Sequence, residues 1–339
     1  MAVVYTAICN RDERSVTGMS LLNRSLATVT SIAAREFSVS ASIRAQIKNL
    51  TIIGSGIMGA GIAQGRVMLQ VSAQAKINVT LVDQSDEILK KGYAGIDKNL
   101  RRMYKKKFAE DKQAQESMVS DVFKHITTTT NIAESVKEAD LVIEAIVENL
   151  EIKQKLFEQV ESAAPSHTIL ATNTSSLRLS DVASKLKRKD KFGGLHFFNP
   201  VPVMKLLEVI RSKDTSDETF DSLLQFGKAI GKETVRCKDT PGFIVNRLLV
   251  PYLFEAIRLI ERDDAKLADI DTAMKLGAGY PMGPFELADY VGLDTCKFIV
   301  DGWHKAYPNE ALFQPSEILN QLVAAGKRGK KSGEGFYRY

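Results

Sequence analysis

Features that mark several protein classes are scarce or missing in this chain of 339 residues. Only three cysteines occur, Cys9, Cys237 and Cys296, and none belongs to a Cys-x-x-Cys pair, so neither a disulfide framework nor a zinc-finger site is expected. No run of apolar residues approaches about 18, the length that a membrane-spanning helix requires. We therefore expect a protein with no metal centre and no membrane span.

Charge of one sign is also not in excess. The chain carries a net charge of +5 at pH 7, and residues 1–49, with six basic and three acidic side chains, contribute +3 of it. The remainder is nearly neutral, whereas nucleic-acid binding requires a concentrated basic face. With 44% hydrophobic and 26% charged residues the composition is that of a globular protein, and the length predicts about two domains.

The first 46 residues differ in composition from the rest and predict a targeting segment. From Met19 to Ser40 the chain is rich in Ser, Thr, Ala and Arg, and Arg24 and Arg35 share one face at helical spacing. Such a segment is typical of a mitochondrial transit peptide, which predicts a location in the mitochondrial matrix. A leader without function is the alternative. Because the residues before Met19 fit a presequence less well, Met1 and Met19 are both candidate start sites.

A glycine-rich turn after the first predicted strand indicates a dinucleotide site. Residues 48–53 are an apolar run of the kind found in buried parallel strands, and the sequence GSGIMG follows them. In such a turn the first glycine makes the tight bend, the second lets the backbone approach a pyrophosphate, and the third lets the next helix pack closely. The pyrophosphate then meets the N-terminus of that helix. We assign to cofactor binding Gly54, Ser55, Gly56, Ile57, Met58 and Gly59.

A carboxylate at the end of the second predicted strand, residues 78–82, specifies the cofactor. Asp83 can bind both hydroxyls of the adenine ribose and would repel a 2′-phosphate, so NAD is favoured over NADP. The interval from Gly59 to Asp83 is 24 residues, against about 20 in the usual unit. The excess, near Gly65 to Gln70, leaves open a longer helix, a bulged loop or an error in the derived sequence.

Strands and helices continue to alternate and predict an α/β fold. A helix over 88–107 is followed by strands at 141–146 and 168–172, with a helix over 150–163 between them. This order predicts a Rossmann-like, doubly wound, mostly parallel sheet with its ligand at the carboxyl ends of the strands. The basic cluster that ends the helix over 88–107 is either a solvated face or an anchor for phosphates.

Two further predicted strands carry a histidine and a carboxylate. His196, one of only four histidines, lies in an apolar segment that Pro200 closes, and residues 204–210 form a second strand that carries Glu208. The prolines between these strands indicate a turn, so we expect the two side chains to be neighbours. A carboxylate at Nδ1 would fix the imidazole tautomer and leave Nε2 to accept a proton during alcohol oxidation. From spacing alone, a structural core histidine is an equal alternative.

The chain after Cys237 predicts an all-α domain. We expect a long helix with Asp239 or Thr240 as its cap and Pro241 in its first turn. Its broad apolar face suggests burial against a second copy of the chain as well as against its own core. Asn246, near its start, is interpreted either as a group that faces the substrate or as a helix-cap amide.

Taken in order, seven segments closely resemble the L-3-hydroxyacyl-CoA dehydrogenase family, in particular its mitochondrial short-chain, monofunctional type. They are GSGIMGAGIAQ, LVIEAIVENLEIK, ATNTSSL, GLHFFNPVPVMKLLEVI, CKDTPGFIVNRLL, AGYPMGPFELADYVGLDT and GKKSGEGFY. The resemblance implies NAD-dependent oxidation of L-3-hydroxyacyl-CoA to 3-oxoacyl-CoA in fatty-acid β-oxidation, and a homodimer formed through the C-terminal helices. We accordingly divide the chain into a leader (1–46), an NAD-binding Rossmann-like domain (47–238) and an all-α C-terminal domain for substrate and dimerisation (239–339).

The resemblance also implies roles for single residues. His196 would be the general base and Glu208 its acidic partner, with Ser175 and Asn246 on the substrate. The further cofactor contacts implied are Glu148, Lys153, Ser175, Asn199 and Lys331, and the coenzyme A contacts are Ser175, Asn99 and Lys106. The family has a serine at the position of Asn99, which puts that contact in doubt, and the excess near Gly65 is also absent from its pattern.

Two other functions compete with this interpretation. The first is a related dehydrogenase that acts on a small hydroxyacid or a sugar acid, and the basic helix over 98–107 argues against it because a small acid needs no distant phosphate anchor. The second is an NAD-binding protein without catalysis. That alternative predicts decay of the base, its partner or the substrate-side residues, and all of them stand in their motifs.

Overall fold

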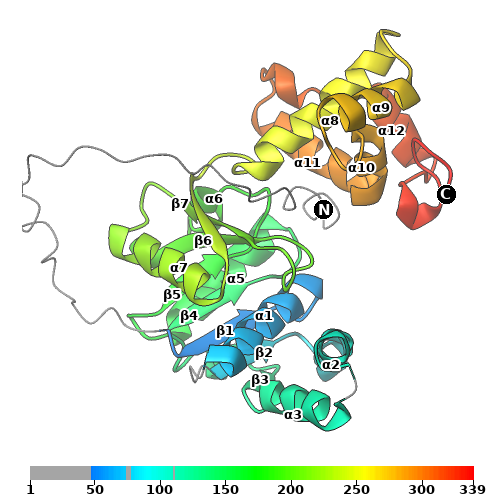
Figure 1. The fold of residues 1–339 in the computed structure, drawn as a ribbon. Helices are drawn as coiled ribbons and strands as arrows, with labels where there is room; N and C mark the ends of the chain where they lie inside the picture. The colour runs from blue at the N-terminus through cyan, green and yellow to red at the C-terminus, as the bar shows by residue number, and fades with distance from the viewer. Residues whose placement is uncertain (1–46, 74–77, 110) are drawn as a thin grey trace, which may run out of the picture. The chain divides into compact units, whose positions relative to one another are not determined.

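The computed structural model describes residues 47–73, 78–109 and 111–339 (Figure 1), without the side chains of 66–73. The predicted leader, residues 1–46, lies outside the described residues. None of the helices described is both long and apolar enough to cross a membrane.

An eight-stranded sheet organises the chain up to residue 238. Its strand order is β3-β2-β1-β4-β5-β6-β7-β8, and the pairs from β3 to β6 are parallel. Strand β7 runs antiparallel to β6 and parallel to β8. The strands are β1 (Asn49–Ile53), β2 (Asn78–Val82), β3 (Ile126–Thr129), β4 (Leu141–Glu144), β5 (Ile169–Thr172), β6 (Phe192–Phe197), β7 (Leu206–Arg211) and β8 (Glu233–Lys238). The predicted Rossmann-like, mostly parallel sheet is confirmed, and its order reverses between β1 and β4, where such sheets bind ligands.

Two hydrophobic clusters pack against the sheet. Successive residues of β1, Ile52 and Ile53, belong to different clusters because neighbouring side chains of a strand point to opposite faces. Burial on both faces explains why these strands are continuous apolar runs. The helices of this part are α1 (Ile57–Ala73), α2 (Asp86–Lys107), α3 (Lys112–Phe123), α4 (Ile132–Ser135), α5 (Leu150–Ala163), α6 (Leu179–Val182), the short η1 (Lys189–Lys191) and α7 (Asp217–Ala229).

The excess residues near Gly65 extend a helix. The backbone of α1 continues through Gly65 to Gln70 and ends at Ala73. Between a longer helix and a bulged loop, the structure therefore has the longer helix.

Helices make up the rest of the chain, as predicted. They are α8 (Val245–Glu261), α9 (Leu267–Gly277), α10 (Pro284–Val291), α11 (Leu293–Ala306), η2 (Ala311–Phe313), α12 (Glu317–Ala324) and η3 (Lys330–Ser332). Asp289 of α10 binds the C-terminal segment to these helices. Its two carboxylate oxygens accept from the backbone N–H groups of Phe336 and Tyr337, each at 2.9 Å.

The predicted start of the long helix is wrong. Helix α8 begins at Val245 because Gly242 and Phe243 have φ of 76° and 54°, outside the helical region. Its N-cap residue, Ile244, provides no side-chain cap. Asp239 instead accepts from the backbone N–H groups of Leu179 and Ser180 at the start of α6. The carboxylate therefore binds a helix N-terminus, but that of a different helix.

Candidate active site

The glycine turn after β1 has the shape that a pyrophosphate requires. Gly54 has φ of 107°, and a Cβ there would lie 2.5 Å from the carbonyl oxygen of Ala145. A Cβ on Gly59 would lie 1.7 Å from the carbonyl oxygen of Gly54. A Cβ on Gly56 would meet nothing within 4 Å, so open space lies before the backbone just ahead of α1. These residues fit the diphosphate of NAD at a helix N-terminus.

Asp83 at the end of β2 holds this turn in place. Its Oδ2 accepts from the backbone N–H and from the hydroxyl of Ser55, each at 2.7 Å, and its Oδ1 accepts from the backbone N–H of Gln84. The sequence predicted only a contact of this carboxylate with ribose. The hydrogen bonds to Ser55 show that Asp83 also stabilises the conformation of the glycine turn.

His196 and Glu208 form a buried pair. They lie directly opposite each other in the antiparallel register of β6 and β7, and Nδ1 of His196 is 2.6 Å from Oε2 of Glu208. The side chains are 6% and 0% exposed. A carboxylate only accepts, so Nδ1–H is the donor and Nε2 keeps its lone pair in the neutral ring. The predicted adjacency is confirmed, and its catalytic role stays a prediction.

The other oxygen of Glu208 binds the start of α8. Its Oε1 accepts from the backbone N–H groups of Ile244, at 3.1 Å, and Val245, at 2.8 Å. Two N–H donors compensate this buried carboxylate, which pairs with no lysine or arginine in the part of the chain that the structure describes. Sequence reasoning missed this contact because the turn that creates it depends on the backbone of Phe243.

A second buried network surrounds Lys153 on α5. Its Nζ lies 2.5 Å from Oε1 of Glu144 and 3.1 Å from Oε2 of Glu148. Glu144 also accepts from the hydroxyl of Thr172, its neighbour across β4 and β5, at 2.7 Å. The sequence did not identify Glu144, which stands in an otherwise apolar strand and is 0% exposed.

Glu148 connects this network to the loop after β5. Its Oε1 accepts from the hydroxyls of Thr174 and Ser176 and from the backbone N–H of Ser175. Burial raises the pKa of Glu148, but the charge of Lys153 and these hydroxyl donors outweigh it and hold the pKa below the ordinary 4.5. The carboxylate is therefore ionised at neutral pH.

Ser175 and Asn246 also meet. The side-chain Nδ2 of Asn246, in the first turn of α8, donates to the carbonyl oxygen of Ser175 at 3.3 Å. Asn246 is thus an amide that ties α8 to the loop after β5, and it does not cap its own helix.

A cavity of about 260 Å³ collects several of the predicted site residues. It is lined by Met58, Ala145, Ile146, Glu148, Lys153, Asn173, Ser175, His196 and Phe197. The glycine turn, the Lys153 network and the imidazole thus face one space. The lining does not include Asn199, which is exposed, or Lys331, which pairs with Asp294.

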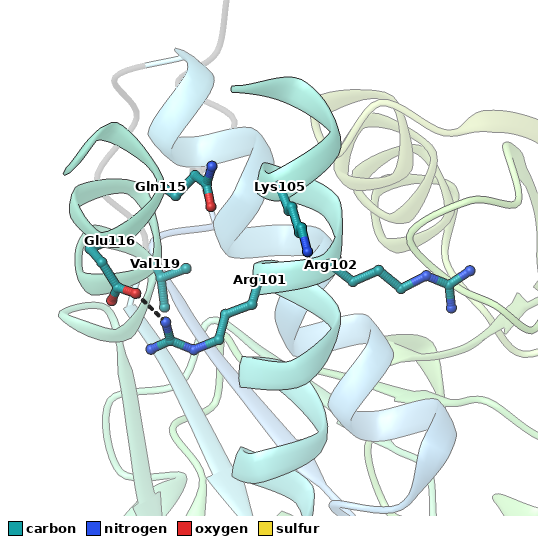
Figure 2. A pocket seen from close by; sticks show the side chains of 6 residues that line it. All are labelled: Arg101, Arg102, Lys105, Gln115, Glu116 and Val119. Atoms are coloured by element: carbon teal, nitrogen blue, oxygen red, sulfur yellow. Dashed lines mark hydrogen bonds and ion pairs between the residues drawn. The ribbon is translucent and has the colours of Figure 1, made fainter. Parts of the chain in front are cut away.

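The basic end of α2 has two differently charged sides. Arg101 donates to Asp97, with Nε at 2.8 Å, and also pairs with Glu116 on α3. Figure 2 shows Arg101 directed toward Glu116, whereas Arg102 extends away from it. A surface cavity of about 260 Å³ is lined by residues of α2 and α3, namely Arg101, Arg102, Lys105, Gln115, Glu116 and Val119.

Two of the three predicted coenzyme A contacts, Asn99 and Lys106, lie on the other side of α2. Asn99, Arg102 and Lys106 are spaced by three and four residues, so they share one exposed side of the helix. Within 47–73, 78–109 and 111–339, no carboxylate forms an ion pair with Arg102 or Lys106. This side therefore has uncompensated positive charge, while the charge of Arg101 is balanced.

Comparison with known proteins assigns nearly all of the described residues to two domains of one enzyme family. Residues 49–240 match the NAD binding domain of 3-hydroxyacyl-CoA dehydrogenase, and residues 242–339 match the C-terminal domain of the same enzyme. The chain belongs to the 3-hydroxyacyl-CoA dehydrogenase family. The resemblance inferred from the motifs is confirmed, and with it an NAD-dependent dehydrogenase.

Relatives and solved structures of this family cover most of the chain. A mitochondrial hydroxyacyl-coenzyme A dehydrogenase of Homo sapiens is 59% identical over 293 residues, which is 86% of this chain and 91% of that protein. A probable 3-hydroxyacyl-CoA dehydrogenase of Caenorhabditis elegans is 61% identical over 314 residues, 93% of this chain and 99% of that protein. The crystal structure of (S)-3-hydroxybutyryl-CoA dehydrogenase from Ralstonia eutropha superposes with a TM-score of 0.80 at 36% identity, covering 87% of this chain and 99% of that one.

Proposed function

We propose that this protein oxidises L-3-hydroxyacyl-CoA to 3-oxoacyl-CoA in fatty-acid β-oxidation, with His196 as the general base. The observation that carries the proposal is the 2.6 Å contact between Nδ1 of His196 and Glu208, beside a cavity that Lys153 and Ser175 also line. NAD supplies the hydride acceptor.

The base step follows from the tautomer of His196. Nε2 accepts the proton of the C3 hydroxyl while the hydrogen on C3 leaves as hydride. The imidazolium that forms is stabilised by the carboxylate of Glu208, which the N–H groups of α8 keep in place. The proton then passes to solvent, so the products are the 3-oxo thioester, NADH and a proton.

Other residues hold the cofactor and the substrate. The GSGIMG turn and Asp83 hold the diphosphate and the adenine ribose, while Glu148, Lys153, Ser175, Asn199 and Lys331 are assigned to the rest of the cofactor. Ser175 and Asn246 orient the acyl group. Asn99 and Lys106 bind coenzyme A, for which the uncompensated charge on that side of α2 is the support.

The activity is tested by NADH oxidation with acetoacetyl-CoA in one assay and with free acetoacetate in another. The proposal predicts turnover of the thioester and little turnover of the free acid. Preference for the free acid would favour the small-hydroxyacid alternative. NADH binding without turnover of either compound would favour the NAD-binding protein without catalysis.

We further propose that residues 1–46 direct the chain to the mitochondrial matrix, and that the helices after residue 238 form a homodimer. The relatives of Homo sapiens and Sus scrofa are named mitochondrial, and Leu248 on α8 is 70% exposed. A fluorescent reporter fused to residues 1–46 tests the first proposal, and a diffuse cytosolic signal contradicts it. Light scattering of the purified protein tests the second, and the mass of a monomer contradicts it.

A further inference from the structure

We propose that Phe243 is a positioning residue for the His196–Glu208 pair, and that it acts through both its ring and its backbone. The inference rests on the proposed function, because it concerns the base of that reaction. Phe243 is 3% exposed and lies in the turn between β8 and α8, one residue before the helix cap.

The backbone of Phe243 creates the donor pair for Glu208. Phe243 has φ of 54° in the left-handed region, and Ile244 after it returns to the right-handed region with φ of −105°. Successive residues of opposite hand direct their N–H groups into one concave site that binds anions. Here the anion is the side chain of Glu208, whose Oε1 accepts from Ile244 and Val245.

The ring of Phe243 contacts the base itself. Its centroid lies 5.6 Å from that of His196, and the ring of Phe198 lies 4.5 Å from the same imidazole. Two aromatic rings and one carboxylate therefore restrict the rotation of His196. An imidazole held in this way presents Nε2 in a single direction.

A phenylalanine is an unusual choice for this conformation. Glycine adopts a positive φ without steric cost, whereas an aromatic residue at such a φ is rare and is retained where its surroundings determine it. If the turn only had to bind Glu208, a glycine would serve as well as it does at Gly242. The ring on His196 is the part of Phe243 that a glycine cannot replace.

The variant Phe243→Gly separates the two contributions. Glycine keeps the left-handed backbone and the N–H groups on Glu208, and it removes only the ring. With acetoacetyl-CoA and NADH we expect kcat to fall by about tenfold or more, because a misdirected catalytic group costs rate, with both KM values within about twofold. Without the ring of Phe243, the imidazole is expected to rotate away from Glu208 for part of the time. In ¹⁵N NMR spectra of the ligand-free protein, the neutral ring of His196 should then change from the single Nδ1–H tautomer to a mixture of both tautomers.

Controls keep the test specific. His196→Gln identifies the signal of that ring among the four histidines. Phe254→Ala removes a buried ring of the same size, 1% exposed, from the core of the C-terminal helices. It should lower thermal stability while leaving kcat and the tautomer unchanged.

A folded Phe243→Gly protein with kcat within twofold of the wild type and a single Nδ1–H tautomer would overturn the proposal. The spectra remain decisive if acetoacetyl-CoA is not a substrate, so a failure of the proposed function and a failure of this inference can be distinguished.

Discussion

Glu208 places its two carboxylate oxygens on different partners, Oε2 on Nδ1 of His196 and Oε1 on two backbone N–H groups at the start of α8. In each of these contacts Glu208 is the acceptor, so a side chain that also donates cannot replace it without a change of partner. The pair depends on residues from β6, β7 and the turn before α8. The geometry of the His196–Glu208 pair therefore depends on the packing of segments that are distant in the sequence.

The variant Glu208→Gln tests this requirement. The amide oxygen is expected to take the two N–H donors of α8, so the amide NH₂ faces His196. The ring must then accept at Nδ1 and carry its proton on Nε2, where it cannot act as a base. We expect kcat to fall by about 10²–10⁴-fold with little change in NADH affinity, measured by stopped flow and by fluorescence titration. A kcat within threefold of the wild type would remove Glu208 from the mechanism.

Lys106→Ala tests the coenzyme A side of α2. The loss of this cation, which no carboxylate of the described residues pairs, should raise KM for acetoacetyl-CoA by roughly three- to tenfold and leave kcat unchanged, and added salt should reduce the difference. Arg101→Ala is the matched control, because Arg101 lies on the same helix but is neutralised by Asp97 and Glu116. Equal effects of the two substitutions would show that the helix acts only through its net charge.

Asp83→Asn tests the cofactor assignment. Removal of the charge at the end of β2 should raise KM for NADH by roughly tenfold and improve the use of NADPH relative to NADH, because a 2′-phosphate is no longer repelled. Ser55→Ala removes one of the two bonds from Ser55 to Asp83 without altering its charge, so it should raise KM for NADH but leave the preference unchanged. An unchanged preference for NADH over NADPH in Asp83→Asn would show that Asp83 does not determine cofactor specificity.

Glu148 should make the free energy of unfolding depend on pH in the acid range. Its pKa in the folded protein is below the ordinary 4.5, so its contribution is fully present above the pKa of the unfolded chain and is lost as the pH falls through the folded pKa. Glu148→Gln should therefore show a smaller loss of stability than the wild type between about pH 6 and pH 3, measured by urea unfolding. Glu151→Gln, an exposed position in the first turn of α5 three residues after Glu148, is the control and should follow the wild type. Parallel curves for Glu148→Gln and the wild type would contradict the prediction.

The fold and much of the candidate site could be predicted from the sequence, because strands, turns and the glycine motif leave patterns in neighbouring residues. The second predicted strand has the observed bounds, Asn78–Val82. The prolines after His196 correctly indicated the turn that pairs this residue with Glu208, because they exclude a continued ladder.

Other contacts had no local pattern to reveal them. Nothing in the sequence indicates that Phe243 adopts a positive φ, so the start of α8 was misplaced and the second contact of Glu208 was missed. Glu144 was missed because its partner Lys153 lies on another element, and a buried ion pair is defined by tertiary packing. Such contacts depend on the assembled sheet rather than on the spacing of residues.

The most direct test of the account is the turnover of His196→Gln with acetoacetyl-CoA and NADH, beside its affinity for NADH. The account predicts a kcat lower by about 10²–10⁴-fold, because the general base is gone, and an unchanged dissociation constant for NADH, because the glycine turn and Asp83 are intact. A kcat equal to that of the wild type would contradict the assignment of His196 and the mechanism built on it.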